Sequence, residues 1–573
     1  MHRIARDDQP VPTQHRPRHA DPDDTVVLEP IGDTVVLPAI RDHHASDDTI
    51  VLPRMGVAAS SLPLPEQEAE PQPAGAADVG RSDARLGHAL KWSYVLTTGG
   101  YAVIALLTFV LASILSPREF GVLAMALVWV ALAMVLLQHG PTMAVIQQDD
   151  ITEDHVNAAF WSTLIGAAGF CVVFAALAPL WAALNGLPEL TPICWALTPM
   201  VMIQAFNVIP DAVLRRRMQM RGIAIRSLVA NLAGGVAGIG CALAGLGVWS
   251  LVVQQITFPT LYGIMLWSII DWRPRFAPIR KSFRDIRRTS LQTYGGSIGN
   301  YLSLRSDVLV MGLFFGPVVI GLYRFAARFA EMAVDLTASG LHQVSLPHLA
   351  RHSQDKPALG RELGRLMHGT AVLACPVLGI VAGVAQPLVL FIGDQWGDAG
   401  GALRVLCLVS AVWMVGTLCG QALQAAQRAG IPALFTWITM VCAIAGIVFA
   451  SLLSSGSDTT TKLMAAAWAM LATQVVTITA MGYVTYRVIL KVSIWPTVMG
   501  ALPGVLSGVA AAAGGAGVYA VVDGVLNKFL ALAASGTAAS VAAAIVLLTL
   551  DGEVRGRLAR IAGRLRRTPA PAA

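Results

Sequence analysis

The residues best able to do chemistry lie in one apolar stretch, 317–346, with the sequence PVVIGLYRFAARFAEMAVDLTASGLHQVSL. Five ionisable residues occur in it, at successive spacings of four, three, four and seven: Arg324, Arg328, Glu331, Asp335 and His342. At about 100° per residue, these side chains share one narrow stripe of a helix. Guanidinium groups beside carboxylates can pair with one another or bind an anion.

These charged residues lie in a helix that is otherwise apolar. The other faces of the same helix carry side chains such as Val319, Phe325 and Met332, which suit lipid or apolar neighbours. An ionised group near the bilayer centre costs roughly 2.5 to 3.5 kcal/mol, so the stripe must face a bundle interior or a water-filled cavity. Two interpretations stay open: a structural ion-pair ladder through Arg328 and Glu331, or a polar cavity that handles a charged substrate.

Composition identifies the class of protein. Of 573 residues, 55% are hydrophobic and only 13% are charged, whereas soluble domains carry about 25% charged residues. The chain is therefore an integral membrane protein. Its seven cysteines lie in apolar stretches without a CxxC pair, which indicates neither a disulfide framework nor a zinc site. The polar N-terminus indicates no cleavable signal peptide, and we expect no cofactor, metal or nucleic-acid partner.

Residues 1–80 differ from the rest of the chain. They contain 14 acidic and 6 basic residues, are rich in Pro, Asp, His and Ala, and lack sustained apolar periodicity, which predicts a disordered acidic tail. The phrases DDTVVLEP, GDTVVLP and DDTIVLP recur in it. Either this is low-complexity drift, or the phrases bind a partner at a sheet edge or through phosphorylation of Thr25, Thr34 and Thr49.

From about residue 93 to residue 549 the chain is a succession of apolar segments. At about 20 residues per span, we expect about fourteen transmembrane helices in an all-α, polytopic membrane protein. The predicted spans are 93–115, 120–146, 157–182, 190–210, 224–245, 248–270, 291–315, 318–345, 367–392, 402–424, 432–453, 463–486, 496–521 and 526–549.

Basic residues predict the orientation. With the N-terminus inside, the predicted inner loops and the C-terminal tail hold 24 Lys and Arg, while the outer loops hold three, Arg118, Lys462 and Lys528. The positive-inside rule therefore places both termini in the cytoplasm. In the tail, 551–573, an apolar stripe runs among arginines, which indicates an amphipathic helix on the anionic inner leaflet; a solvated basic tail is the alternative.

An internal repeat relates two parts of the chain. LSPREFGVLAMA at 115–126 aligns without a gap with FGPVVIGLYRFA at 315–326, pairing Pro117 with Pro317 and Gly121 with Gly321. The charged helix is thus the counterpart of the second span. This predicts two pseudo-symmetric lobes related by an axis along the membrane normal, with the substrate site between them. At the aligned positions the second span has only Ala124, Val128, Ala131 and Val135.

The seventh span adds polar residues to the charged stripe. Asn300, Arg305 and Asp307 lie within NYLSLRSDVLVMG, and a short turn at Gly316-Pro317 leads into the eighth span. The two helices should form an antiparallel hairpin, which brings Arg305 near Arg324 or Arg328. Facing arginines favour an anion, and guanidinium forks suit phosphate. Gln254, Gln255 and Asn207 either line the same cavity or make helix–helix hydrogen bonds.

Several segments resemble a known family of transporters. The stretches LSPREFGVLAMALVW (115–129), AVIQQDDITEDHVNAAFWSTLIG (144–166), PDAVLRRRMQMR (210–221), AGLGVWSLVVQQ (244–255), SDVLVMGLFFGPVVIGLYRFAARFA (306–330) and FIGDQWGDAG (391–400) are similar to Wzx-type bacterial polysaccharide flippases. These belong to the multidrug/oligosaccharidyl-lipid/polysaccharide exporter superfamily. The resemblance covers roughly residues 90–550. Where the family usually has a basic residue, Asp149 and Asp150 follow Gln148 here.

The resemblance implies two six-helix lobes in a V, two extra C-terminal helices, and translocation of an undecaprenyl-pyrophosphate-linked oligosaccharide across the cytoplasmic membrane for cell-surface polysaccharide biosynthesis. A polysaccharide polymerase and chain-length machinery are the expected partners. The expected divisions are a disordered tail (1–80), an N-terminal lobe (81–290), a C-terminal lobe (291–490), two additional helices (491–550) and a basic tail (551–573).

We expect seven residues to bind the substrate. The three arginines contact the pyrophosphate, and the three acidic residues act as counter-charges. The seven are Arg305, Arg324, Arg328, Asp307, Glu331, Asp335 and Asn300. A polymerase or ligase would need a sizeable outer loop, and no predicted outer loop much exceeds ten residues. A cation-coupled multidrug exporter would favour a lone carboxylate in an apolar cavity, whereas several arginines favour an anionic cargo. That exporter and a peptidoglycan lipid II flippase remain the alternatives.

Overall fold

The computed structural model describes residues 100, 103–139, 142, 145, 152–216, 220–275, 280–552 and 554–556, and for 280–300 the course of the backbone alone. The described residues are helical and include no strand. A short apolar helix, Val103–Ile114, comes first. The labelled α-helices that follow are α2 (Pro117–His139), α4 (Glu153–Leu184), α5 (Leu190–Arg216), α6 (Met220–Leu243), α7 (Val248–Ile269), α8 (Arg280–Thr337), α9 (Ser339–Ala350), α10 (Lys356–Gly383), α11 (Ala385–Ile392), α12 (Ala399–Ala425), α13 (Gly430–Leu453), α14 (Thr459–Tyr483), α15 (Trp495–Val522) and α16 (Lys528–Leu550).

Eleven helices among the described residues are long and apolar enough to cross a membrane. The all-α, multi-pass architecture is therefore confirmed, whereas the count of fourteen spans is not. Part of the first predicted span falls outside the described residues. The sixth forms the helix α7 but is not among the eleven, and the seventh and eighth run together as one element, α8. The acidic tail 1–80, its three recurring phrases, Gln148 to Asp150 and most of the basic tail also fall outside the described residues.

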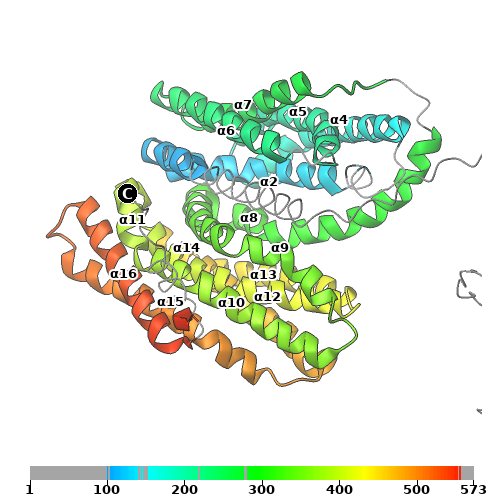
Figure 1. Cartoon of the computed structure of the whole chain (residues 1–573). Helices are drawn as coiled ribbons and strands as arrows, with labels where there is room; N and C mark the ends of the chain where they lie inside the picture. Colours follow the sequence, from blue (N-terminus) through cyan, green and yellow to red (C-terminus); the bar gives the residue numbers. More distant parts are fainter. Residues whose placement is uncertain are drawn as a thin grey trace, which may run out of the picture. The chain divides into compact units, whose positions relative to one another are not determined.

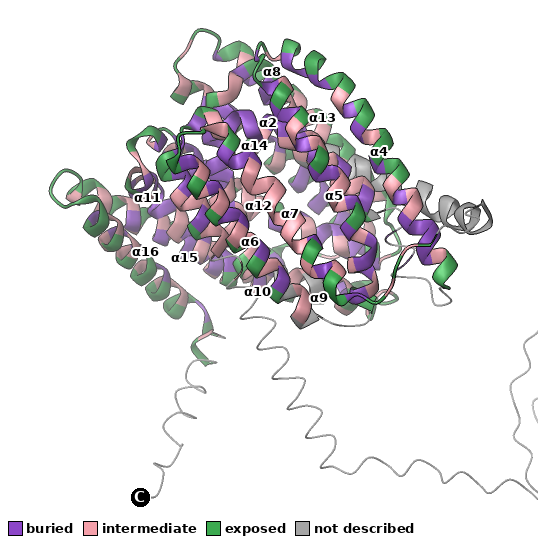
Figure 2. Cartoon of the chain, turned by 90° about the horizontal axis from the view of Figure 1, so that it is seen from above, coloured by how far each residue is buried: buried purple, intermediate pink, exposed green. Residues whose placement is uncertain are grey.

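Large apolar side chains remain exposed on the outward faces of the helices. Val172 of α4 is 70% exposed, Phe449 of α13 is 62% exposed and Ile545 of α16 is 57% exposed. Figure 2 shows such exposed positions along the helices α4 and α16. In water such patches would promote association, but in a bilayer they contact lipid tails. The exposure pattern agrees with the multi-pass membrane architecture.

α8 consists of two helices joined at Gly316, where φ is 77° and ψ is 174°. This left-handed φ suits glycine, and Pro317 can begin a helix because its first position needs no backbone donor. The predicted turn is thus confirmed. The first helix begins at Arg280, before the predicted start at 291, because its polar early turns extend beyond the apolar segment. The second ends at Thr337, where Ala338 separates it from α9.

α2 and the second helix of α8 cross through the two repeat-related glycines. A Cβ atom added at Gly121 would lie 1.8 Å from the carbonyl oxygen of Pro317, and one at Gly321 would lie 1.8 Å from that of Pro117. Only glycine permits this approach. The contact is reciprocal, as a local twofold axis between the two helices requires. The alignment of these two segments in the sequence therefore corresponds to a direct contact in the fold.

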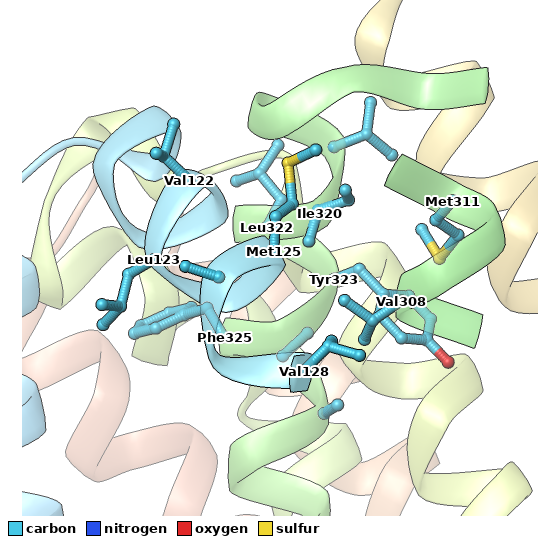
Figure 3. Packing of buried hydrophobic residues seen from close by; sticks show 14 of the residues in the cluster. Val122, Leu123, Met125, Val128, Val308, Met311, Ile320, Leu322, Tyr323 and Phe325 are labelled. Carbon is cyan, nitrogen blue, oxygen red and sulfur yellow. The ribbon is translucent and has the colours of Figure 1, made fainter. Parts of the chain in front are cut away.

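The core of the described chain is built around this crossing. Met125 and Val128 of α2 pack with Ile320, Tyr323 and Phe325 of α8, and all five are at most 5% exposed. Figure 3 shows these side chains interleaved between the two helices. In a bilayer such helices gain stability mainly from close van der Waals contact, because lipid is as apolar as the side chains. The crossing thereby fixes the register of the charged stripe on α8.

Candidate functional site

One carboxylate stands at the centre of three guanidinium groups. Glu331 lies 3.2 Å from Arg324, 3.7 Å from Arg305 and 3.8 Å from Arg328, measured between the nearest nitrogen and oxygen atoms. We call these four residues the arginine cluster. The sequence pointed to the local pair of Arg328 and Glu331. The structure adds the two other arginines, so the cluster is more than a ladder along one helix.

Two helices position the cluster. Arg305 comes from the first helix of α8, and the other three members come from the second. The turn at Gly316 folds these helices back on each other, so residues 26 positions apart in sequence reach one carboxylate. Within the second helix, spacings of four and three place Arg324, Arg328 and Glu331 on one face. The predicted approach of Arg305 to the stripe is thus found in the structure.

The cluster is accessible, because its side chains are 20% to 37% exposed. Each guanidinium carries five N–H donors, far more than the one carboxylate can accept. Only the contact from Arg324 to Glu331 is a hydrogen bond, at 3.2 Å. The described part of the chain thus presents three adjacent cations with spare donors. Such an array suits a multivalent anion that carries many acceptor oxygens.

Asp307 plays a different part from Glu331. It is only 6% exposed, and its carboxylate accepts a 2.7 Å hydrogen bond from the backbone nitrogen of Val308. Tyr323 and Arg324 lie close enough to interact with it electrostatically. Asp307 is therefore a buried acidic residue beside the cluster, and its part in substrate binding stays a prediction.

The stripe continues beyond the cluster. Asp335 is half-buried, beside Arg328 and Glu331. The break at Ala338 is slight, because the backbone bonds from Ala338 to Val334 and from His342 to Ala338 are kept, at 2.8 and 2.9 Å. His342 therefore stays in register with the stripe. The amide of Gln421 donates to the carbonyl oxygen of His342 at 3.0 Å, which fixes this end of the stripe against α12.

Two further predictions concern amides. Asn300 lies in the first helix of α8, but its side chain lies outside the described residues, so its assignment stays a prediction. Asn207 is 3% exposed and donates a 2.9 Å hydrogen bond to the carbonyl oxygen of Pro259, which ties α5 to α7. Of the two interpretations of Asn207, the helix–helix hydrogen bond is the one found.

The sequence pattern predicted no role for Trp396, a buried aromatic residue that packs on the crossing. Trp396 is fully buried, with its ring stacked on that of Phe325 at 3.9 Å and edge-on to Phe120 at 5.3 Å. Its indole nitrogen donates to the carbonyl oxygen of Ala112 at 2.7 Å. Trp396 thus links the segment after α11 to the crossing of α2 and α8. The only signal was its place in the motif FIGDQWGDAG.

Comparison with known proteins identifies the family. Residues 110–400, just over half of the chain, match a family described as "Polysaccharide biosynthesis protein". The chain belongs to this polysaccharide biosynthesis family. The matched region contains both repeat-related helices, the whole arginine cluster and Trp396. The resemblance noted from the sequence motifs is therefore confirmed for the part of the chain that holds the site.

Individual members of the polysaccharide biosynthesis family are moderately similar. The succinoglycan biosynthesis transport protein ExoT of Rhizobium meliloti (strain 1021) is 27% identical over 356 residues, which cover 62% of this chain and 71% of that protein. The lipopolysaccharide biosynthesis protein WzxC of Escherichia coli (strain K12) is 25% identical over 60% of this chain and 70% of its own length. The teichuronic acid biosynthesis protein TuaB of Bacillus subtilis (strain 168) is 21% identical.

Solved structures show the same fold for this family member. A lipid II flippase, MurJ, in an inward closed conformation has a TM-score of 0.61 at 13% identity, covering 80% of this chain and 98% of that one. An inward-facing multidrug resistance transporter of the MOP superfamily has a TM-score of 0.51 at 14% identity, covering 67% and 94%. The predicted fold, that of two helical solved transporters, is thus also the fold of this chain.

Proposed function

We propose that this protein is a flippase that moves a lipid-linked oligosaccharide, carried on undecaprenyl pyrophosphate, across the cytoplasmic membrane. The observation that carries the proposal is the arginine cluster, in which three guanidinium groups share one carboxylate. A pyrophosphate brings several acceptor oxygens and more negative charge than Glu331. It therefore offers acceptors to more of the guanidinium N–H groups than one carboxylate can.

Partner exchange gives a physical route from binding to movement. In the empty site, Glu331 holds the three arginines together and limits their mutual repulsion, while Asp307 and Asp335 supply further negative charge nearby. An arriving pyrophosphate replaces these contacts. Because Arg305 is on a different helix from the other two arginines, the exchange changes the force between the two helices of α8. That change is the step that we propose to couple cargo binding to rocking of the lobes.

The proposal includes an orientation and an organisation. Both termini lie in the cytoplasm, as the distribution of basic residues indicates. Residues 81–290 and 291–490 act as the two moving lobes, and 491–550 supply two additional helices. The polysaccharide polymerase and its chain-length machinery receive the cargo at the outer face. The acidic tail 1–80 serves a regulatory partner rather than the transport step.

Two alternatives differ in their demands on the cluster. A cation-coupled exporter needs a carboxylate that is free to bind a cation, whereas Glu331 already contacts three arginines. A lipid II flippase would also carry a pyrophosphate and would use the same cluster. The names of the relatives in polysaccharide biosynthesis favour a surface-polysaccharide cargo over a peptidoglycan precursor.

A leaflet-sidedness assay of lipid-linked glycan, in cells that lack the protein and are supplied with variants, tests the proposal. We expect Arg328→Lys to keep part of the transport, and Arg328→Ala and Arg328→Glu to lose it while the protein still assembles. Arg305→Ala and Arg324→Ala should behave like Arg328→Ala. The matched control is Arg118→Ala, which removes an exposed arginine paired with Glu189 at 2.7 Å. Normal transport by all three cluster alanine variants would place the cargo site elsewhere.

A further inference from the structure

A large pocket lies away from the arginine cluster, between α10, α15 and α16. Its volume is about 1070 Å³. Figure 1 shows these three helices together, and α15 packs mainly on α10 and α16. α10 also packs against α8 and α12, so it stands between this pocket and the helix that carries the cluster. The pocket is therefore separate from the proposed transport site. We call it the α10–α15 pocket.

The walls of the pocket have two chemical characters. Arg361, Arg365 and His368 line it from α10, and Thr497 adds a hydroxyl from α15. Apolar walls come from Leu373, more than one turn beyond His368 on α10, and from Leu547 of α16. Leu373 is 53% exposed, as expected for a side chain that meets lipid. Along α10, the pocket therefore has a polar end at Arg361 and Arg365 and an apolar end at Leu373.

Close helix packing accounts for where the pocket is open. Further along the same helix pair, a Cβ atom at Gly379 would lie 2.1 Å from the carbonyl oxygen of Gly508, so α10 and α15 touch there. Backbone contact continues to Gly504, whose added Cβ would lie 2.4 Å from the carbonyl carbon of Ala371. Nearer the arginines, an added Cβ would meet side chains instead: Thr497 at 3.0 Å from Gly364, and the Cβ of His368 at 3.9 Å from Gly500. The pocket thus lies at the end of the helix pair where the two backbones no longer touch.

Fixed hydrogen bonds brace the pocket. The Nδ1 atom of His368 lies 2.6 Å from the carbonyl oxygen of Gly500, so this nitrogen must be the donor. The other ring nitrogen lies 3.4 Å from the carboxylate of Asp551, just after α16. One histidine therefore ties together the three helices that form the pocket. The site is held open by specific contacts rather than by loose packing.

The charge balance at the polar end favours an anion. Arg365 pairs with Glu362 at 2.5 Å and His368 with Asp551. Arg361 is exposed and has no ion-pair partner among the described residues. Arg361 therefore adds a positive charge at this end of the pocket that no carboxylate of the described residues pairs with.

We propose that the α10–α15 pocket binds one anionic phospholipid of the surrounding bilayer. The phosphate contacts Arg361 and Arg365, and the upper part of an acyl chain lies against Leu373 and Leu547. A membrane supplies such molecules at both faces, and a pocket with a cationic end and an apolar end matches their two halves. With the proposed orientation, the cationic end faces the inner leaflet, which is the anionic one.

The test uses the full-length protein, purified in a neutral detergent. Phosphatidylglycerol and phosphatidylcholine are titrated separately, and bound lipid is counted by native mass spectrometry. We expect one phosphatidylglycerol to bind the parent at least about tenfold more tightly than phosphatidylcholine. The double variant Arg361→Gln, Arg365→Gln should lose this preference, since each arginine near a membrane surface contributes on the order of a fivefold gain in affinity for an anionic lipid.

Two further variants make the test specific. Gly500→Leu fills the pocket without changing its charge and should reduce phosphatidylglycerol binding by a similar factor. The charge-matched control Arg351→Gln, Arg428→Gln removes two exposed arginines from the same predicted face and should leave the preference intact. Equal loss in the control and in the pocket variant would overturn the proposal, because the preference would then be a general surface effect. So would tighter binding of a polyprenyl phosphate, or saturation of the site by inorganic phosphate alone.

Discussion

α2 and the second helix of α8 occupy equivalent places and have opposite chemistry. At the crossing each contributes a glycine to a contact that the other mirrors. Within about three turns of Gly321, α8 carries Arg324, Arg328 and Glu331, whereas the aligned positions of α2 are Ala124, Val128 and Ala131. The two helices therefore have to match in sequence only where their backbones touch. The charged site is built on one member of the pair.

The largest effect should come from breaking the symmetric contact. We expect Gly321→Leu and Gly121→Leu to destabilise the protein by about 3 kcal/mol or more, because each new side chain would collide with a carbonyl group that cannot yield. Yield of monodisperse protein and thermal unfolding in detergent measure this. Gly169→Leu in α4 is the control, since its Cβ would meet nothing within 4 Å. If only one of the two variants lost stability, the symmetric contact would not be needed for folding.

The next effect concerns the asymmetric chemistry. Glu331→Gln leaves three arginines without the carboxylate that they share. Because the competitor of the cargo is removed, we expect pyrophosphate binding to be kept or tightened, while transport falls by about tenfold or more. Binding of a pyrophosphate-bearing lipid and the leaflet-sidedness assay are measured on the same variant. Glu189→Gln, which removes the exposed partner of Arg118, should change neither. Loss of binding together with transport would contradict partner exchange.

A smaller effect is expected at Trp396, whose ring packs against both α2 and α8. Trp396→Phe removes the indole hydrogen bond to Ala112 and keeps an aromatic ring against Phe120 and Phe325. The loss should cost about 1 kcal/mol of stability, since the carbonyl oxygen of Ala112 loses its shorter hydrogen bond and keeps only the 3.3 Å one from the amide of Gln395. Chemical denaturation in mixed micelles measures the difference. Trp495→Phe, at a ring that is 63% exposed, should be neutral; an equal cost there would mean that the bond from Trp396 contributes nothing.

The smallest effect should follow from removing residues 1–80. The proposed function places the transport chemistry on α8, and the composition of this tail gives it no means of forming a core. We expect the truncated protein to assemble and to transport at the rate of the parent. Membrane abundance and the leaflet-sidedness assay check this. Failure of the membrane part to assemble would show that the tail contributes to folding.

The sequence alone determined the membrane class, the charged stripe and the repeat. Apolar runs of membrane-spanning length and spacings of three and four are local properties of a helix, so they can be predicted without knowing any tertiary contact. The turn at Gly316-Pro317 followed from the φ preferences of those two residues. The count of spans did not follow, because a turn as short as this one leaves two spans continuous in the described chain.

Only the tertiary structure decided which charges meet. Arg305 could approach Arg324 or Arg328 by the pattern alone, and the fold brings all three arginines to Glu331, while Asp307 turns inward to Tyr323. Asn207 binds Pro259 and Trp396 binds Ala112, although neither partner is near in sequence. The physical reason is that these contacts depend on how closely two helices approach. At the crossing of α2 and α8 that distance is set by one glycine on each helix, so it is a property of the pair.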